Sequence, residues 1–172
     1  EPLALDIFLQ DGRNPEELAK AYIDPEKGVE TLEDALAGAS DIIAEMISDD
    51  ADIRKALREK MESKAVMTVQ ATDPDNDSVY RNYYAFSSPV SRLQNHQILA
   101  INRGEKEEFL KVSVEFDRSK AMFIIGKSHI KEGSPCTAAV TAAAEDAYER
   151  LIFPSIQREV RSELSDRAYS GA

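Results

Sequence analysis

Basic side chains flank an apolar helical pattern between Arg92 and Lys106, and this stretch has the residue types best suited to binding an anion. It contains Arg92, His96, Arg103 and Lys106 and closes on Asn-Arg-Gly-Glu-Lys. Fixed positive charges and the backbone N–H groups of a glycine turn are groups that bind phosphate. A capped helix in which Arg103 pairs with a neighbouring glutamate explains the same residues. We favour this structural interpretation and keep phosphate binding as the alternative.

A second set of arginines lies near the end of the sequence. Arg150, Arg158 and Arg161 fall within reach of one face of a predicted helix. Glu163 precedes Arg167 by four residues, a spacing typical of a salt-bridged surface helix. A structural role is again favoured, with a phosphate contact as the alternative. The candidate nucleic-acid-binding residues of the chain are therefore Arg92, His96, Arg103, Lys106, Arg158 and Arg161.

No pattern in the sequence predicts a catalytic centre. The single cysteine, Cys136, follows His129 by seven residues, but the local signature of a catalytic cysteine is missing. A cysteine at the start of an alanine-rich helix is ordinarily a small buried residue. Serine-hydrolase, phosphate-loop and dinucleotide-binding signatures are also missing from the sequence. We therefore expect that the chain is not an enzyme.

The sequence supports a metal site no better than it supports a catalytic centre. Asp73, Asp75 and Asp77 resemble the opening of an EF-hand loop, yet Ser78 and Tyr84 stand where that loop requires glycine and glutamate. A solvated turn is the favoured interpretation. One cysteine and two histidines are little material for a zinc or iron site. We expect neither a metal nor a cofactor.

The charge of the chain restricts its partners. Among 172 residues, 21 Lys and Arg stand against 32 Asp and Glu, which gives a net charge of −11. Residues 1–65 hold 17 acidic and 8 basic side chains, whereas 66–130 hold 8 of each and 131–172 hold 7 and 5. A phosphate backbone is repelled by the first third and must approach through the rest. No apolar run approaches the roughly 20 residues of a transmembrane helix, and we expect no membrane contact.

Apolar spacing predicts a mainly α fold, and its first helices are the clearest. Asn14-Pro15 is a helix-start signal. Thr31 begins a second helix, whose apolar residues repeat at three- and four-residue intervals. Gly38 inside this helix suggests that another backbone packs closely against it. Ser48 or Asp49 is the expected cap of a further helix.

The rest of the chain adds a small β element to a multi-helix assembly. Ser91 is expected to cap a helix that stops at Gly104. Alternating apolar and polar residues over 109–116 predict a half-buried strand, and 65–70 is a second, shorter candidate. Pro154 either kinks the alanine-rich helix before it or opens the next helix.

We expect residues 1–172 to form one helical region of a larger multidomain protein. Acidic helices over 1–64, a mixed α/β part over 65–130 and C-terminal helices over 131–172 are its expected sub-units. The first residue is Glu1 rather than methionine, which fits a piece of a longer polypeptide.

Five stretches, in order along the whole chain, resemble the Tex family of bacterial transcription accessory proteins. The most specific is His96–Glu107, which reads HQILAINRGEKE. The others are Glu1–Ala4, Ala35–Glu45 with the Ile53-Arg54 and Leu57-Arg58 pairs after it, Tyr80–Tyr84 and Arg150–Arg161. Asn95, Gln97 and Gln157 depart from the serine, arginine and glutamate usual in the family. The arginine missing at position 97 removes one anion contact and weakens the case for phosphate binding there.

The resemblance implies a role within a larger machine. Tex proteins are cytoplasmic, multidomain nucleic-acid-binding proteins related to a eukaryotic transcription elongation factor. They contain a nuclease-like domain, helix-hairpin-helix elements and a C-terminal OB-type RNA-binding domain, and this chain resembles the helical region before the nuclease-like domain. The implied function is a non-catalytic scaffold that positions those downstream domains. Nucleic acid, RNA or DNA, would be bound by the full-length protein, and weakly or not at all by this fragment.

The charge pattern supports an alternative of a different class. Acidic N-terminal helices could dock a basic partner from the transcription or translation machinery, such as a polymerase or a ribosomal component. Neutralising Asp49, Asp50 and Asp52 should then release that partner.

Overall fold

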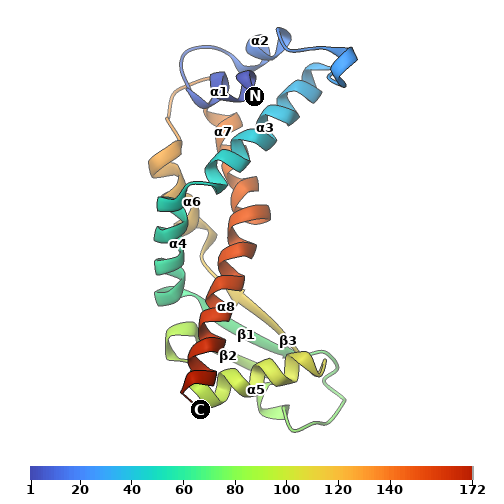
Figure 1. Cartoon of the computed structure of the whole chain (residues 1–172), viewed down its shortest axis with the longest axis vertical. Helices are drawn as coiled ribbons and strands as arrows, with labels where there is room; N and C mark the ends of the chain where they lie inside the picture. The colour runs from blue at the N-terminus through green and yellow to red at the C-terminus, as the bar shows by residue number, and fades with distance from the viewer. Residues whose placement is uncertain (172) are drawn as a thin grey trace. The chain divides into compact units, whose positions relative to one another are not determined.

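The structure, a computed structural model, describes residues 1–171 and is dominated by helices (Figure 1). The chain divides into two compact units, each built from two separate stretches. The first unit comprises residues 1–54 and 119–154, and the second comprises 55–118 and 155–172. The predicted mainly α fold class is confirmed.

Helix α3 is the centre of the first unit. It spans Leu32–Ser48 and packs against α1 (Pro2–Phe8), α2 (Pro15–Lys20) and α7 (Thr137–Asp146), as Figure 1 shows. The sequence patterns did not predict α1. Small residues on α3 and α7 bring the two helices close together, and the fully buried larger side chains of the unit include Ile7, Ile43, Ile47 and Val140.

Local capping explains where several helices begin. The Oδ1 atom of Asn14 accepts the N–H of Glu16 at 2.8 Å, and Thr31 Oγ1 accepts that of Asp34 at 3.1 Å. Both predicted helix starts are therefore confirmed. By contrast, α4 (Ala51–Lys64) is capped by Asp50 instead of Ser48 or Asp49.

The expected caps of α4 were wrong because α3 runs further than predicted. Ser48 is its last residue, and the N–H of Asp49 closes its final turn on the carbonyl of Glu45 at 2.9 Å. The close approach expected at Gly38 is also not found. A Cβ atom added there would meet no atom of the described chain within 4 Å.

The second unit contains an antiparallel sheet of three strands in the order β2-β1-β3. The central strand β1 (Val66–Ala71) pairs with β2 (Ala85–Pro89) and with β3 (Leu110–Glu115), and Val69 faces Phe86 on one side and Val112 on the other. The strands predicted at 65–70 and 109–116 are confirmed. Strand β2 was missed because its sequence, AFSSP, has no clear apolar alternation.

Helix α5 (Asn95–Lys106) packs against β3, and both of its predicted limits were wrong. Its cap is Gln94, whose N–H donates to Gln97 Oε1 at 3.0 Å, whereas Ser91 lies in a short 3₁₀ turn (Val90–Arg92) before it. Gly104 does not end the helix, which continues to Lys106. The glycine is needed because Leu110 of β3 and the ring of Tyr80 pack against it.

The remaining helices are α6 (Arg118–His129) and α8 (Phe153–Ser170). A π-helical turn (Ala147–Ile152) leads from α7 into α8. Helical backbone is unbroken from Thr137 to Ser170, so Pro154 does not open a separate helix. Of the two roles expected for it, the structure fits the distortion of the preceding helix: the helix widens into the π-helical turn just before Pro154, which has no N–H to donate.

Candidate functional site

Four of the six predicted nucleic-acid-binding residues line two adjoining hollows between α5 and α8 in the second unit. Arg103 and Lys106 line a hollow of about 560 Å³, and Arg158 and Arg161 line one of about 400 Å³. Asn102 belongs to both. We call this surface the α5–α8 groove; its lining residues are Asn102, Arg103, Glu105, Lys106, Glu107, Arg158, Arg161, Ser162, Ser165 and Tyr169.

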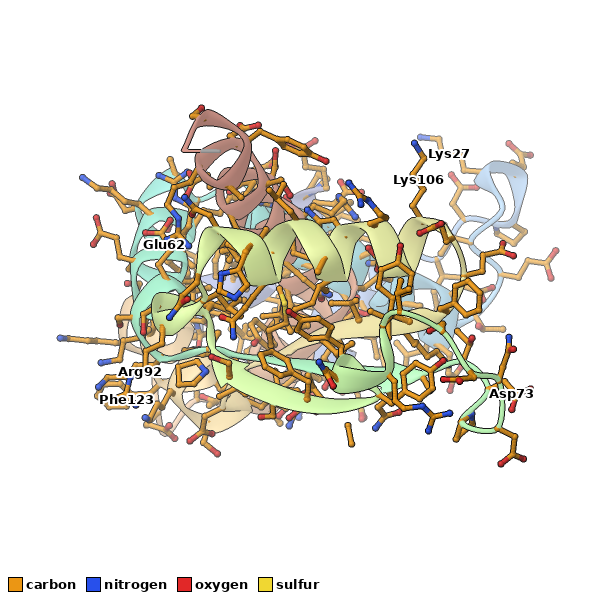
Figure 2. The ribbon with its side chains drawn as sticks, turned by 90° about the horizontal axis from the view of Figure 1, so that it is seen from below. Lys27, Glu62, Asp73, Arg92, Lys106 and Phe123 are labelled. Atoms are coloured by element: carbon orange, nitrogen blue, oxygen red, sulfur yellow. The ribbon has the colours of Figure 1, made fainter. Side chains whose placement is uncertain are left out.

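The other two predicted residues lie apart from this groove. Arg92 ends the 3₁₀ turn before α5, and His96 lies in the first turn of α5. Both are exposed. His96 is ten residues before Lys106, which corresponds to about 15 Å along the helix. Figure 2 shows Arg92 and Lys106 at opposite ends of α5.

Arg161 is the most constrained cation of the groove. Its guanidinium donates to both carboxylate oxygens of Glu105 at 2.8 Å and to Asn102 Oδ1 at 3.1 Å. The side-chain amide of Asn102 donates to Ser165 Oγ at 2.8 Å, and this hydroxyl donates to the carbonyl of Arg161 at 2.9 Å. A bidentate, charge-assisted pair is among the stronger surface interactions. The network therefore ties α5 to α8.

This network replaces the pairing predicted for Arg103. Glu105 is taken by Arg161, and Glu107 accepts the phenolic hydroxyl of Tyr80. Within residues 1–171, Arg103, Lys106 and Arg158 are exposed and make no ion pair. They are three free positive charges around a groove that an arginine–glutamate pair holds together.

The residues of the α5–α8 groove are suited to weak binding of an anion. Its lining carries four positive and two negative side chains. Exposed charges contribute little individually and are screened by salt. Tyr169, whose side chain is 67% exposed, adds an aromatic face that could stack on a base.

The net charge of the chain lies entirely in the first unit. That unit holds 8 basic and 19 acidic residues, a net charge of −11, whereas the second holds 13 of each. The α5–α8 groove therefore belongs to an electrically neutral unit.

A second hollow, of about 400 Å³, lies in the acidic first unit among α2, α3 and α7. Sequence reasoning missed it. We call it the α3–α7 groove; it is lined by Ile7, Pro15, Glu16, Leu36, Ala37, Ser40, Ile43, Ala139 and Ala142. Exposed alanines on amphipathic helices, Ala37 and Ala142, were the only signal available.

Polar groups elsewhere in the first unit have structural partners. Asp50 Oδ2 lies 2.8 Å from His129 Nε2, which joins the start of α4 to the end of α6. Burial raises the pKa of Asp50, but the N–H groups of Ile53 and Asp52 and the ring of His129 lower it more, so its pKa lies below the ordinary value. Cys136 is fully buried, its thiol donates to the carbonyl of Arg13 at 3.3 Å, and burial raises its pKa. A raised pKa disfavours the thiolate nucleophile.

The aspartates that resemble an EF-hand form a turn. Asp73 accepts the N–H of Asp75 at 3.0 Å through its side chain and that of Asn76 at 3.1 Å through its carbonyl. Figure 2 shows Asp73 in the loop after β1. Across residues 1–171, no three His, Cys, Asp or Glu side chains are arranged to hold a metal ion. No helix in this part of the chain is long and apolar enough to cross a membrane.

The fold and its grooves define a mainly α module with a small antiparallel sheet. The Tex central region-like family model matches residues 10–172, and the chain belongs to this family. It is 40% identical to the uncharacterized protein YdcI of Bacillus subtilis, over 87% of this chain and 21% of that protein. It is 32% identical to Protein tex of Bordetella pertussis, over 66% of this chain and 15% of that protein.

A more distant relative is eukaryotic. The transcription elongation factor SPT6 homolog of Arabidopsis thaliana is 27% identical, over 94% of this chain and 11% of that protein. The chain thus spans about a fifth or less of the length of these three relatives. The family resemblance found in the sequence is confirmed.

Proposed function

We propose that the chain is a non-catalytic helical scaffold within a Tex-like transcription accessory protein of the cytoplasm. In this proposal it positions the downstream domains of the same polypeptide, and the full-length protein binds RNA or DNA and acts in transcription. Family membership supports the proposal, as do the names of Protein tex and of the transcription elongation factor SPT6 homolog among its relatives.

One observation carries the scaffold role. Arg161, a residue that the sequence offered for phosphate binding, is used to hold two helices together through Glu105 and Asn102. The cations left free in the α5–α8 groove are exposed and few. By the counterion-release argument, a few phosphate contacts give weak and salt-sensitive binding.

Fluorescence anisotropy with labelled single-stranded RNA, single-stranded DNA and duplex DNA tests this proposal. We expect the full-length protein to bind, and residues 1–172 alone to bind at least about a hundredfold more weakly. Changing Arg103 and Lys106 to glutamate in the full-length protein should alter the affinity by less than about threefold. Nanomolar, salt-sensitive binding by residues 1–172 that these changes abolish would overturn the scaffold role.

A second candidate function is favoured by the separation of charge between the units. All of the net −11 lies in the first unit, so this unit can attract a basic protein while it repels nucleic acid. We propose that it docks a basic component of the transcription or translation machinery. Neutralising Asp49 and Asp52, which are exposed, should release that partner. Asp50 is left unchanged in this test because it caps α4.

A further inference from the structure

We propose that the α3–α7 groove of the first unit binds a basic amphipathic helix of a separate protein. The inference rests on the second function proposed above and names the surface and the chemistry of the partner.

The lining of the groove suits such a helix. Leu36 is half-buried and offers an apolar contact, and the exposed Ala37 and Ala142 have short side chains that leave room beside it. The buried Ile7 and Ile43 lie beneath. Helices dock in grooves through apolar side chains spaced three or four residues apart.

The charges around the groove favour a positively charged partner. Glu16 is part of the lining, and Glu33 lies one turn before Leu36 and Ala37 on the same face of α3. Both carboxylates are exposed. In a unit of net charge −11, lysines or arginines beside the apolar anchors of a partner would be attracted.

The same charges disfavour the other occupants. A nucleic acid is repelled by this unit, and a second copy of the chain would bring an equal negative charge to the contact. Charge complementarity thus favours a basic protein helix.

The probe for this surface is a synthetic helix of about 18 residues made of Lys, Leu and Ala, with its leucines on one face. Binding to residues 1–172 is measured by fluorescence anisotropy. One control peptide has the same composition in scrambled order, and another carries Glu in place of every Lys. We expect the amphipathic basic helix to bind at least about tenfold more tightly than either control.

Variants locate the binding. Ala142→Tyr fills the groove without changing the charge and should weaken binding by about tenfold or more. Ala51→Tyr is the matched control, because Ala51 is also an exposed helical alanine of the first unit but does not line the groove. Glu16→Gln with Glu33→Gln should lower both the affinity and its salt dependence, whereas Glu26→Gln with Glu132→Gln should change them less. Circular dichroism melting checks folding, and Ala37→Tyr serves as a second filling variant.

The outcomes separate this inference from the function on which it rests. The basic helix could bind the native chain, Ala142→Tyr and Ala37→Tyr equally tightly. The α3–α7 groove would then not be the binding site, while the proposed docking of a basic partner by the acidic unit would stand. Equal binding of the scrambled peptide would show charge attraction alone and would also reject the groove. If neither basic peptide binds, both proposals fail. A wild-type dimer that Ala142→Tyr converts to a monomer, measured by sedimentation, would identify a second copy as the occupant.

Discussion

Two glycines in helices have opposite roles, which their neighbours decide. A Cβ on Gly104 would lie 2.8 Å from Leu110 Cγ and 3.1 Å from Tyr80 Cγ, so β3 and an aromatic ring occupy the space that a side chain needs. Gly38 faces open space. From the sequence alone, each glycine was interpreted the wrong way, because the neighbours that matter at Gly104 are distant in sequence or lie outside its helix.

We therefore predict that Gly104→Ala destabilises the chain by about 1–3 kcal/mol, since overpacking outweighs the gain in helix propensity. Gly38→Ala is the matched control and should stabilise it by up to about 1 kcal/mol. Urea unfolding monitored by circular dichroism measures both. Equal effects of the two changes would show that helix propensity alone governs these positions.

Asp50 makes a pH-dependent contribution to stability. Its carboxylate caps α4 and contacts His129, and its pKa in the folded chain is lowered. A lowered carboxyl pKa stabilises the fold above the unfolded value of about 3.9, and this contribution is lost as the pH falls through the folded-state pKa.

Asp50→Ala should thus lower the free energy of unfolding by about 1–2 kcal/mol at pH 7. Thermal melts at pH 7, 5 and 3 should show the difference from wild type shrinking toward the lowest pH. Asp49→Ala is the control, since an exposed acidic residue at the end of α3 opposes the helix dipole and its removal should be neutral or slightly stabilising. If Asp50→Ala lost the same stability at every pH, the pH-dependent contribution of the Asp50 carboxylate would be contradicted.

At the scale of elements, α5 and α8 are joined by the Arg161 network. Arg161→Leu leaves Glu105 without its partner and should cost about 1–2 kcal/mol. Arg161→Lys keeps the charge but loses the bidentate geometry, so its stability should lie between those of the wild type and Arg161→Leu. Chemical unfolding measures stability, and the anisotropy assay measures nucleic-acid affinity. A scaffold role predicts that stability falls while the affinity of the full-length protein stays unchanged.

Helices α4 and α8 bring two carboxyl groups together. A hydrogen bond with Glu163 and burial raise the pKa of Glu62. A raised carboxyl pKa adds stability below the unfolded value of about 4.3, and this stability is lost as the pH rises through the folded-state pKa.

Glu62→Gln should therefore stabilise the chain at pH 7, by less than about 1 kcal/mol because the Glu62 side chain is 43% exposed. The gain should shrink below about pH 4.3. Thermal melts at pH 7 and pH 4 compare the two forms, with Glu115→Gln, at an exposed residue of β3, as the control. If Glu62→Gln destabilised the chain at neutral pH, the raised pKa of Glu62 would be contradicted.

Elements with strong local signals were predicted well, and those determined by distant contacts were not. Asn14 and Thr31 satisfy backbone N–H groups two or three residues away, so they mark the starts of α2 and α3 within a few letters of sequence. Strand β3 alternates because one face is buried. Strand β2 is defined by its pairing with β1, a partner that its own residues do not reveal.

At the scale of the whole molecule, the two units group the charged residues differently from the three successive thirds of the sequence. The first unit takes residues 119–154 together with the N-terminal stretch, and with them it takes the whole net charge. The second brings 155–172 to the sheet and α5, so that Arg158 and Arg161 line the same groove as Arg103 and Lys106. These two basic stretches are about fifty residues apart in sequence.

Composition, charge and short-range periodicity belong to the chain itself, which is why the mainly α class, the family and the acidic balance could be derived from the letters. Which carboxylate pairs with Arg161, why Gly104 must lack a side chain and where the apolar α3–α7 groove opens depend on residues that are distant in sequence or lie outside the helix concerned. Such contacts exist only after the chain has folded, because side-chain pairing and packing are set by distances in space.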